Sequence, residues 1–204
     1  MKLGILSFQG GVIEHVRATK EAVKALGMTD SDCEVIEVKR AGDFASLSGL
    51  IIPGGESTTL GKLIERNQLW DEIRTVPNIF GTCAGAIMLA KKVVGQEEGG
   101  QKFLELMDIE ADRNAYGSQV DSFEEEIAAT LGKPDLKINA IFIRAPKIKP
   151  LSEKCEVIAT RTNGEPIAIS ERLGNHFYLA TSFHPELSTS KLHEYFLKEI
   201  AKKV

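Results

Sequence analysis

The stretch that decides the fold is residues 78–90, which read NIFGTCAGAIMLA. An apolar segment runs into Gly81, Cys83 stands at the turn, and Gly85 opens a run of helix-forming residues. This G-x-C-x-G spacing is the cysteine form of the nucleophile elbow, a strand-to-helix turn that pushes one reactive side chain clear of a sheet. Glycines are needed where strand and helix pinch together, and the helix N-terminus favours a thiolate. The alternative is a buried structural cysteine, a common fate for this residue type.

Composition and charge are those of an ordinary globular chain. With 204 residues, 43% hydrophobic and 26% charged, we expect a single domain over residues 1–204. The net charge of −4 gives no general attraction to nucleic acid or an anionic membrane. The three widely spaced cysteines form no C-x-x-C pair and no cluster with the histidines, so we expect no disulfide framework and no metal site. Because no signal-peptide pattern or long apolar span occurs, we expect a cytoplasmic location.

Hydrophobic periodicity predicts strands that alternate with helices in the first half. Strands are expected at residues 3–8, 34–38, 50–52 and 79–80, and helices at 12–26, after a capping Ser57, and around 70–73. After a loop at 95–102, strands are expected at 104–110, 121–127, 138–143, 155–160, 166–170 and 177–182, before a helix beginning near 188–190. The fold class is therefore α/β, a doubly wound and mostly parallel sheet with helices on both faces and antiparallel strands in the C-terminal half.

A second reactive segment, Phe183-His184-Pro185-Glu186, ends an expected strand. Pro185 favours an extended backbone at His184, and residues two apart in an extended segment point the same way, so Glu186 can reach the ring. A carboxylate on one imidazole nitrogen fixes the tautomer and leaves the other nitrogen facing a nucleophile. For this short pattern alone, a surface histidine in a turn is the more common explanation.

Residues 53–57, PGGES, end another expected strand. Two glycines let backbone N–H groups turn toward a developing negative charge, and the amides of Gly55 and Ala84 would form a two-donor oxyanion hole. A simple loop is the alternative. A phosphate-binding loop is excluded, because Gly55 precedes Gly61 by six positions and Leu63 stands where Ser or Thr is needed.

Together these segments resemble the class I, triad-type glutamine amidotransferases. That family has a flavodoxin-like doubly wound α/β fold and hydrolyses glutamine to glutamate and ammonia. Within the class, the resemblance narrows over nearly the whole chain to the glutaminase subunits of pyridoxal 5′-phosphate synthase. It rests on residues 9–10 with 14–15, 53–59, 81–85, 113–114 with 116–117 and 119, 121–123, and 142–146.

The resemblance implies roles for particular residues. Cys83 would be the nucleophile, His184 the general base and then acid, and Glu186 the group that orients His184. The glutamine pocket would be lined by Gly55, Glu56, Ser57, Arg113, Ile143 and Arg144. No cofactor is expected, because pyridoxal 5′-phosphate is the product of the whole complex.

The resemblance also implies a partner, the synthase subunit that receives ammonia, and weak activity until that partner docks. Candidates for the interface are Gln9, Gly10, Glu14 and His15, although polar residues at a helix N-terminus explain them equally well. Ser118 and Ile13 depart from the family pattern and weaken the partner and pocket assignments. Two other interpretations of the function remain open. One is a glutaminase serving another synthase, such as imidazole glycerol phosphate synthase, and the other is a non-catalytic stress or chaperone protein with an elbow cysteine.

Overall fold

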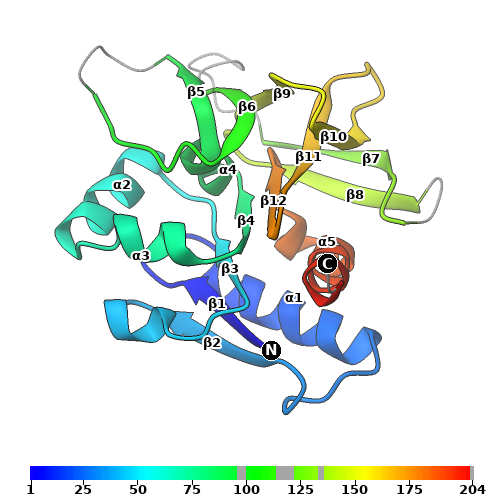
Figure 1. Ribbon diagram of the computed structural model, residues 1–204. Coiled ribbons are helices and arrows are strands. Elements are labelled where there is room, and N and C mark those ends of the chain that lie inside the picture. Colours follow the sequence, from blue (N-terminus) through cyan, green and yellow to red (C-terminus); the bar gives the residue numbers. More distant parts are fainter. Residues whose placement is uncertain (96–99, 114–121, 133–135, 203–204) are drawn as a thin grey trace.

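Alternating strands and helices build the first half of the chain, as the hydrophobic pattern predicts. The computed structural model describes residues 1–95, 100–113, 122–132 and 136–202 (Figure 1). The first half contains β1 (Lys2–Leu6), α1 (Val12–Ala25), β2 (Glu34–Val38), the 3-10 helix η1 (Ala41–Phe44), β3 (Gly49–Ile52), α2 (Ser57–Arg66), α3 (Trp70–Thr75), β4 (Asn78–Thr82) and α4 (Ala84–Leu89). Strands β3 and β4 are buried along their whole length, as parallel strands covered on both faces must be.

Strands dominate the second half. It contains β5 (Ala90–Val94), β6 (Met107–Asp112), β7 (Phe123–Ala129), β8 (Leu136–Phe142), β9 (Lys147–Pro150), β10 (Cys155–Thr160), β11 (Pro166–Leu173), β12 (His176–Thr181), the 3-10 helix η2 (Pro185–Leu187) and α5 (Lys191–Ala201). Strands β5 and β9 are absent from the sequence prediction, because both are short and lysine-bearing and form by pairing with β6. The predicted strand at 104–110 begins later, since the amides of Leu104 and Leu106 bond instead to the end of α4.

The main sheet joins a parallel half to an antiparallel half. Over the described ranges, its nine strands have the order β2-β1-β3-β4-β12-β11-β10-β7-β8. Neighbours from β2 to β12 are parallel, and neighbours from β12 to β8 are antiparallel. Strands β5, β6 and β9 form a second, smaller sheet. The predicted α/β class with antiparallel strands in the C-terminal half is confirmed. The antiparallel part of the main sheet is larger than the prediction of a mostly parallel sheet implied.

Helices cover both faces of the parallel half, as predicted. Successive residues of a strand point to opposite faces, and the core is divided accordingly. Leu3 and Ile5 pack with residues of α1 and α5, including Val23 and Phe196. The opposite face of the sheet packs with α2, α3 and α4. Figure 1 shows α1 and α5 together on one side, away from α2 and α3.

The segment that follows β12 runs along the outer edge of β8. The backbone N–H of His184 donates to the carbonyl oxygen of Ile141 at 2.8 Å. Oγ of Ser188 donates to the carbonyl oxygen of Asn139 at 2.5 Å. Ile141 and Asn139 are two apart on β8, so both carbonyls point away from the neighbouring strand β7. Although β4 and β8 are far apart in strand order, the end of β8 thereby reaches the residues that follow β12.

Candidate active site

Cys83 occupies a strained turn between β4 and α4. Its backbone φ of 48° and ψ of −105° lie in a region that non-glycine residues rarely adopt. The approach of helix to strand requires glycine, because a Cβ at Gly85 would lie 2.1 Å from the carbonyl oxygen of Ile52. A Cβ at Gly81 would meet the backbone of Gly85 at 2.5 Å. The N–H of Cys83 donates to Thr181 of β12 at 2.8 Å. The strand-to-helix elbow predicted from the sequence is therefore present.

His184 and Glu186 form a buried pair just after β12. Nδ1 of His184 lies 2.8 Å from Oε1 of Glu186, and the two residues are 9% and 2% exposed. The predicted contact forms by a different route, because Glu186 lies in the 3-10 turn η2 and not on an extended segment. The turn begins at Pro185, and His184 itself has φ −105° and ψ 83°.

The elbow and the histidine meet at Gly54. A Cβ at Gly54 would lie 2.4 Å from Cε1 of His184 and 3.2 Å from Cβ of Cys83. Burial disfavours the charged ring, but its hydrogen bonds to Cys83 and Glu186 outweigh burial and raise the pKa of His184 to about 10. Sulfur, imidazole and carboxylate thus lie together at the carboxyl ends of β4 and β12, the edge at which open α/β sheets bind ligands.

A cavity of about 200 Å³ opens beside Cys83. Its lining includes all but one of the residues predicted for the glutamine pocket. The exception is Ile143, whose carbonyl oxygen instead lies 3.8 Å from Sγ of Cys83. Ile87 of α4 also lines the cavity and was missed, because an apolar helix residue carries no signal for this position. The lining residues are Gly55, Glu56, Ser57, Cys83, Ile87, Arg113 and Arg144.

The loop after β3 that carries Gly54 and Gly55 lies between Cys83 and the segment that follows β1. A Cβ at Gly10 would lie 2.1 Å from the carbonyl oxygen of Gly54. Gly55 has φ +124°, and a Cβ there would lie 2.9 Å from Nε2 of Gln9. On the other side, the amide of Ala84 directly follows Cys83 at the start of α4. The two amides predicted for the oxyanion hole thus come from segments that both flank the cysteine.

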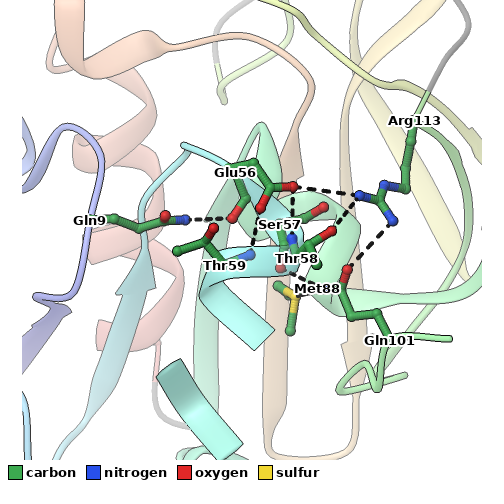
Figure 2. A network of polar contacts seen from close by, with 8 residues as sticks. All are labelled: Gln9, Glu56, Ser57, Thr58, Thr59, Met88, Gln101 and Arg113. Carbon is green, nitrogen blue, oxygen red and sulfur yellow. Dashed lines mark hydrogen bonds and ion pairs between the residues drawn. The ribbon is translucent and has the colours of Figure 1, made fainter. Parts of the chain in front are cut away.

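Glu56 caps α2 and holds an arginine at the cavity (Figure 2). Its carboxylate accepts hydrogen bonds from the amides of Thr58 at 2.9 Å and Thr59 at 2.5 Å. The prediction that Ser57 caps this helix is wrong: Ser57 is its first residue, and the longer Glu56 side chain reaches both free N–H groups. Burial opposes the charge, but these bonds lower the pKa of Glu56 to about 2. Nη2 of Arg113 lies 3.6 Å from Oε1 of Glu56 and 2.9 Å from Oγ1 of Thr58.

Gln101 extends this network by bonding to both Ser57 and Arg113 (Figure 2). Its Nε2 donates to the carbonyl oxygen of Ser57 at 2.5 Å, and its Oε1 accepts from Nη1 of Arg113 at 3.5 Å. On the opposite side, Nε2 of Gln9 donates to the carbonyl oxygen of Glu56 at 2.8 Å. Gln101 falls in a stretch predicted only as a loop, so nothing in the sequence marks it.

The residues proposed for a partner surface divide into two groups. Gly10 is exposed, and Gln9 and Glu14 are partly exposed. His15 is fully buried, at 0% exposed. The prediction that His15 belongs to the partner interface is therefore corrected, because this residue lies on the inward face of α1 and is buried in the core. Ser118 and the family segment around it lie outside the described residues.

The described ranges contain neither a metal-binding cluster nor a membrane-spanning helix. Within residues 1–95, 100–113, 122–132 and 136–202, no three His, Cys, Asp or Glu side chains gather in a way that could hold a metal ion. Over the same residues, no helix has the length and apolar character needed to cross a membrane.

The site combines a cysteine elbow at the carboxyl edge of a parallel sheet with a histidine–glutamate pair after the neighbouring strand. This is the architecture of the class I glutamine amidotransferases. A family model agrees over almost the whole chain. The chain belongs to the SNO glutamine amidotransferase family, whose model matches residues 5–202, and it is an enzyme of the glutamine amidotransferase class.

Named relatives cover the chain from end to end. It is 43% identical over 206 residues to the pyridoxal 5′-phosphate synthase subunit PdxT of Pyrococcus furiosus, covering 98% of this chain and 99% of that protein. It is 41% identical over 209 residues to the protein of the same name from Korarchaeum cryptofilum, covering 100% of both. The crystal structure of a glutamine amidotransferase matches with a TM-score of 0.78 and 41% identity, over 98% of this chain and 99% of that one.

Proposed function

We propose that this chain is the glutaminase subunit of a pyridoxal 5′-phosphate synthase. It hydrolyses L-glutamine to L-glutamate and ammonia and passes the ammonia to a synthase subunit for vitamin B6 synthesis. The observation that carries the proposal is the meeting of Cys83, His184 and Glu186 beside the cavity. Family membership and the names of the relatives quoted above support the choice of synthase over other amidotransferases and over a non-catalytic elbow-cysteine protein.

In the proposed reaction, the Cys83 thiolate attacks the side-chain amide carbon of glutamine. The N–H groups of Gly55 and Ala84 hold the oxyanion of the tetrahedral intermediate. His184 is charged at neutral pH, in keeping with its raised pKa, and it protonates the departing ammonia. The neutral ring then activates the water that releases glutamate from the thioester. Glu186 accepts from Nδ1 of the ring and so keeps Nε2 directed at the sulfur.

The charges around the cavity suit a free amino acid. An α-carboxylate fits a guanidinium fork, and both Arg113 and Arg144 line the space. An α-ammonium fits a carboxylate, and Glu56 supplies one that stays ionised because its pKa is about 2. A volume of about 200 Å³ lies below the range for drug-sized ligands, which favours one small substrate.

The chemistry of the product requires a partner. Ammonia released into water near neutral pH is protonated and loses its nucleophilicity, so the enzyme must hand it over away from solvent. Gln9 and Gly10 lie beside the loop that carries Gly55, and Glu14 follows in the first turn of α1. We propose these three residues as part of the synthase interface. Docking there would act on the oxyanion loop directly, which accounts for the expected weak activity of the free subunit.

Ammonia release from glutamine, measured with and without a pyridoxal 5′-phosphate synthase subunit, tests the proposal. We expect hydrolysis that increases when the synthase subunit is added. Cys83→Ala should lower turnover by a factor of about 10³ or more. Cys155→Ala is the matched control, because this thiol lies on β10 and bonds to the backbone of Asp108, and its turnover should match the wild type. Absence of ammonia release in the presence of the partner, or activity of Cys83→Ala within tenfold of wild type, would contradict the proposal.

A further inference from the structure

Two buried histidines lie next to each other on helices that the proposed reaction does not use, and one of them, His15, contacts Glu186. His15 of α1 and His193 of α5 are 0% and 1% exposed. Nδ1 of His15 lies 2.9 Å from Nε2 of His193, and Nε2 of His15 lies 3.1 Å from Oγ1 of Thr82. The same Nε2 lies 3.4 Å from Oε2 of Glu186. His15 therefore contacts both the carboxylate that holds His184 and the residue that precedes Cys83.

Both rings are neutral. Burial lowers the pKa of His193 to about 3. Burial, and then the nearby His193 and His184, hold the pKa of His15 well below its ordinary value. A neutral imidazole has one N–H and one bare nitrogen. Each ring must therefore donate from one nitrogen only, and the contacts decide which.

The contacts select one arrangement of the two protons. If His193 donates from Nε2 to Nδ1 of His15, then His15 carries its proton on Nε2 and directs it at Thr82 and Glu186. If His15 donates to His193 instead, its bare Nε2 faces a carboxylate oxygen. In that case Nδ1–H of His193 is a buried donor, and this atom has no partner among the described residues. Orphaned buried N–H groups are rarer than orphaned acceptors, and two facing lone pairs repel, so the contacts favour the first arrangement.

We propose that His15, with its tautomer fixed by His193, is a positioning residue that directs Nε2–H at Oε2 of Glu186 and thereby keeps Oε1 on His184. The inference deepens the proposed function and rests on it. Oε1 of Glu186 is engaged by His184 at 2.8 Å. Within the described part of the chain, Oε2 has no hydrogen bond, and the Nε2 of His15 at 3.4 Å is the donor that faces it. Without that donor, a buried carboxylate oxygen is uncompensated and the side chain is free to turn away from the ring.

A pair of amide substitutions separates this role from simple packing. In His15→Gln the side-chain amide reaches the position of Nε2 and keeps a donor toward Glu186. In His15→Asn the amide ends one methylene earlier, near Nδ1, and keeps only the contact with His193. We expect His15→Asn to lower kcat by about tenfold with little change in KM, and His15→Gln to recover most of that loss. Thr19→Val, a buried control on the same helix whose hydroxyl has no partner within the described residues, should leave kcat unchanged.

Histidine tautomers in the wild-type protein give a readout that does not depend on activity. Long-range ¹H–¹⁵N correlation spectra of ¹⁵N-histidine-labelled protein, assigned with the His15 and His193 variants, should show both rings neutral and protonated on Nε2. A charged His15, or a proton on its Nδ1, overturns the proposal. Equal losses of kcat and of melting temperature in the Asn and Gln variants also overturn it, since they indicate packing alone. If the wild type with its synthase releases no ammonia, the proposed function fails, while the spectra still decide the contact.

Discussion

Gly54→Ala tests whether the proposed reaction depends on the placement of His184. Gly54 has no positive φ, so its backbone accepts alanine without strain. The new Cβ, however, would lie 2.4 Å from Cε1 of His184. The loop itself has little room to retreat, because the carbonyl oxygen of Gly54 already lies against Gly10.

The size of the effect follows from that distance. Nonbonded carbons are comfortable at about 3.5 Å, so the ring or the loop must move by about 1 Å. The ring is buried and bound to Glu186, and its displacement separates Nε2 from Cys83. A misplacement of about 1 Å in a catalytic group costs roughly 10²-fold in rate. We therefore expect kcat for glutamine hydrolysis to fall about 10²-fold while the protein stays folded.

The assay is steady-state ammonia release in the presence of the synthase subunit, with circular dichroism as a check on folding. Gly42→Ala is the matched control, because a Cβ at Gly42 meets no atom of the described residues within 4 Å. It should leave kcat unchanged and slightly raise stability. A folded Gly54→Ala protein with kcat within twofold of wild type would refute the placement of the ring against this loop.

Three further predictions concern stability. Gly85→Ala places a Cβ 2.1 Å from the carbonyl oxygen of Ile52 and should lower the free energy of unfolding by about 2 kcal/mol or more. Urea denaturation measures this, with Gly42→Ala as the control. An unchanged midpoint would contradict the packing of the elbow. Glu56→Ala removes both cap bonds of α2 and should cost about 1 kcal/mol, again read from the urea midpoint, and a neutral result would show that Ser57 takes over as cap. The pKa of His184 is about 10 in the fold against an ordinary 6.5, so its charge contributes stability that is complete below pH 6.5 and is lost as pH rises through about 10. The stability difference between wild type and His184→Asn should shrink over that range, and a constant difference would argue against the raised pKa.

The sequence predicted correctly those features that depend on local patterns, namely the parallel strands and the elbow. The apolar runs gave the parallel strands, because a strand buried on both faces must be apolar throughout, as β3 and β4 are. Gly81 and Gly85 marked the elbow, because only glycine fits where α4 approaches β4 and β3. The glycine, histidine and cysteine segments were each found at the end of a strand, and parallel strands bring such ends to one edge.

The remaining features depend on tertiary contacts that no short segment encodes. His15 looks like a polar surface residue at a helix start, and only the packing of α1 against α5 makes it a buried neighbour of His193. Gln101 gains its role because the chain after β5 returns to Arg113 and Ser57. Strands β5 and β9 exist because β6 pairs with both. Glu56, and not Ser57, caps α2, because its longer side chain reaches the amides of Thr58 and Thr59. Capping propensities alone do not predict this.

The segment that carries His184 has a second consequence for the molecule in solution. An unpaired outer strand is a template on which another chain can add, the first step of edge-to-edge aggregation. The backbone N–H of His184 and the hydroxyl of Ser188 bind the outward carbonyls of Ile141 and Asn139 on β8, so the segment that carries the imidazole also shields this edge of the sheet. Substitutions that displace this turn should therefore both abolish activity and expose the edge of β8 to aggregation.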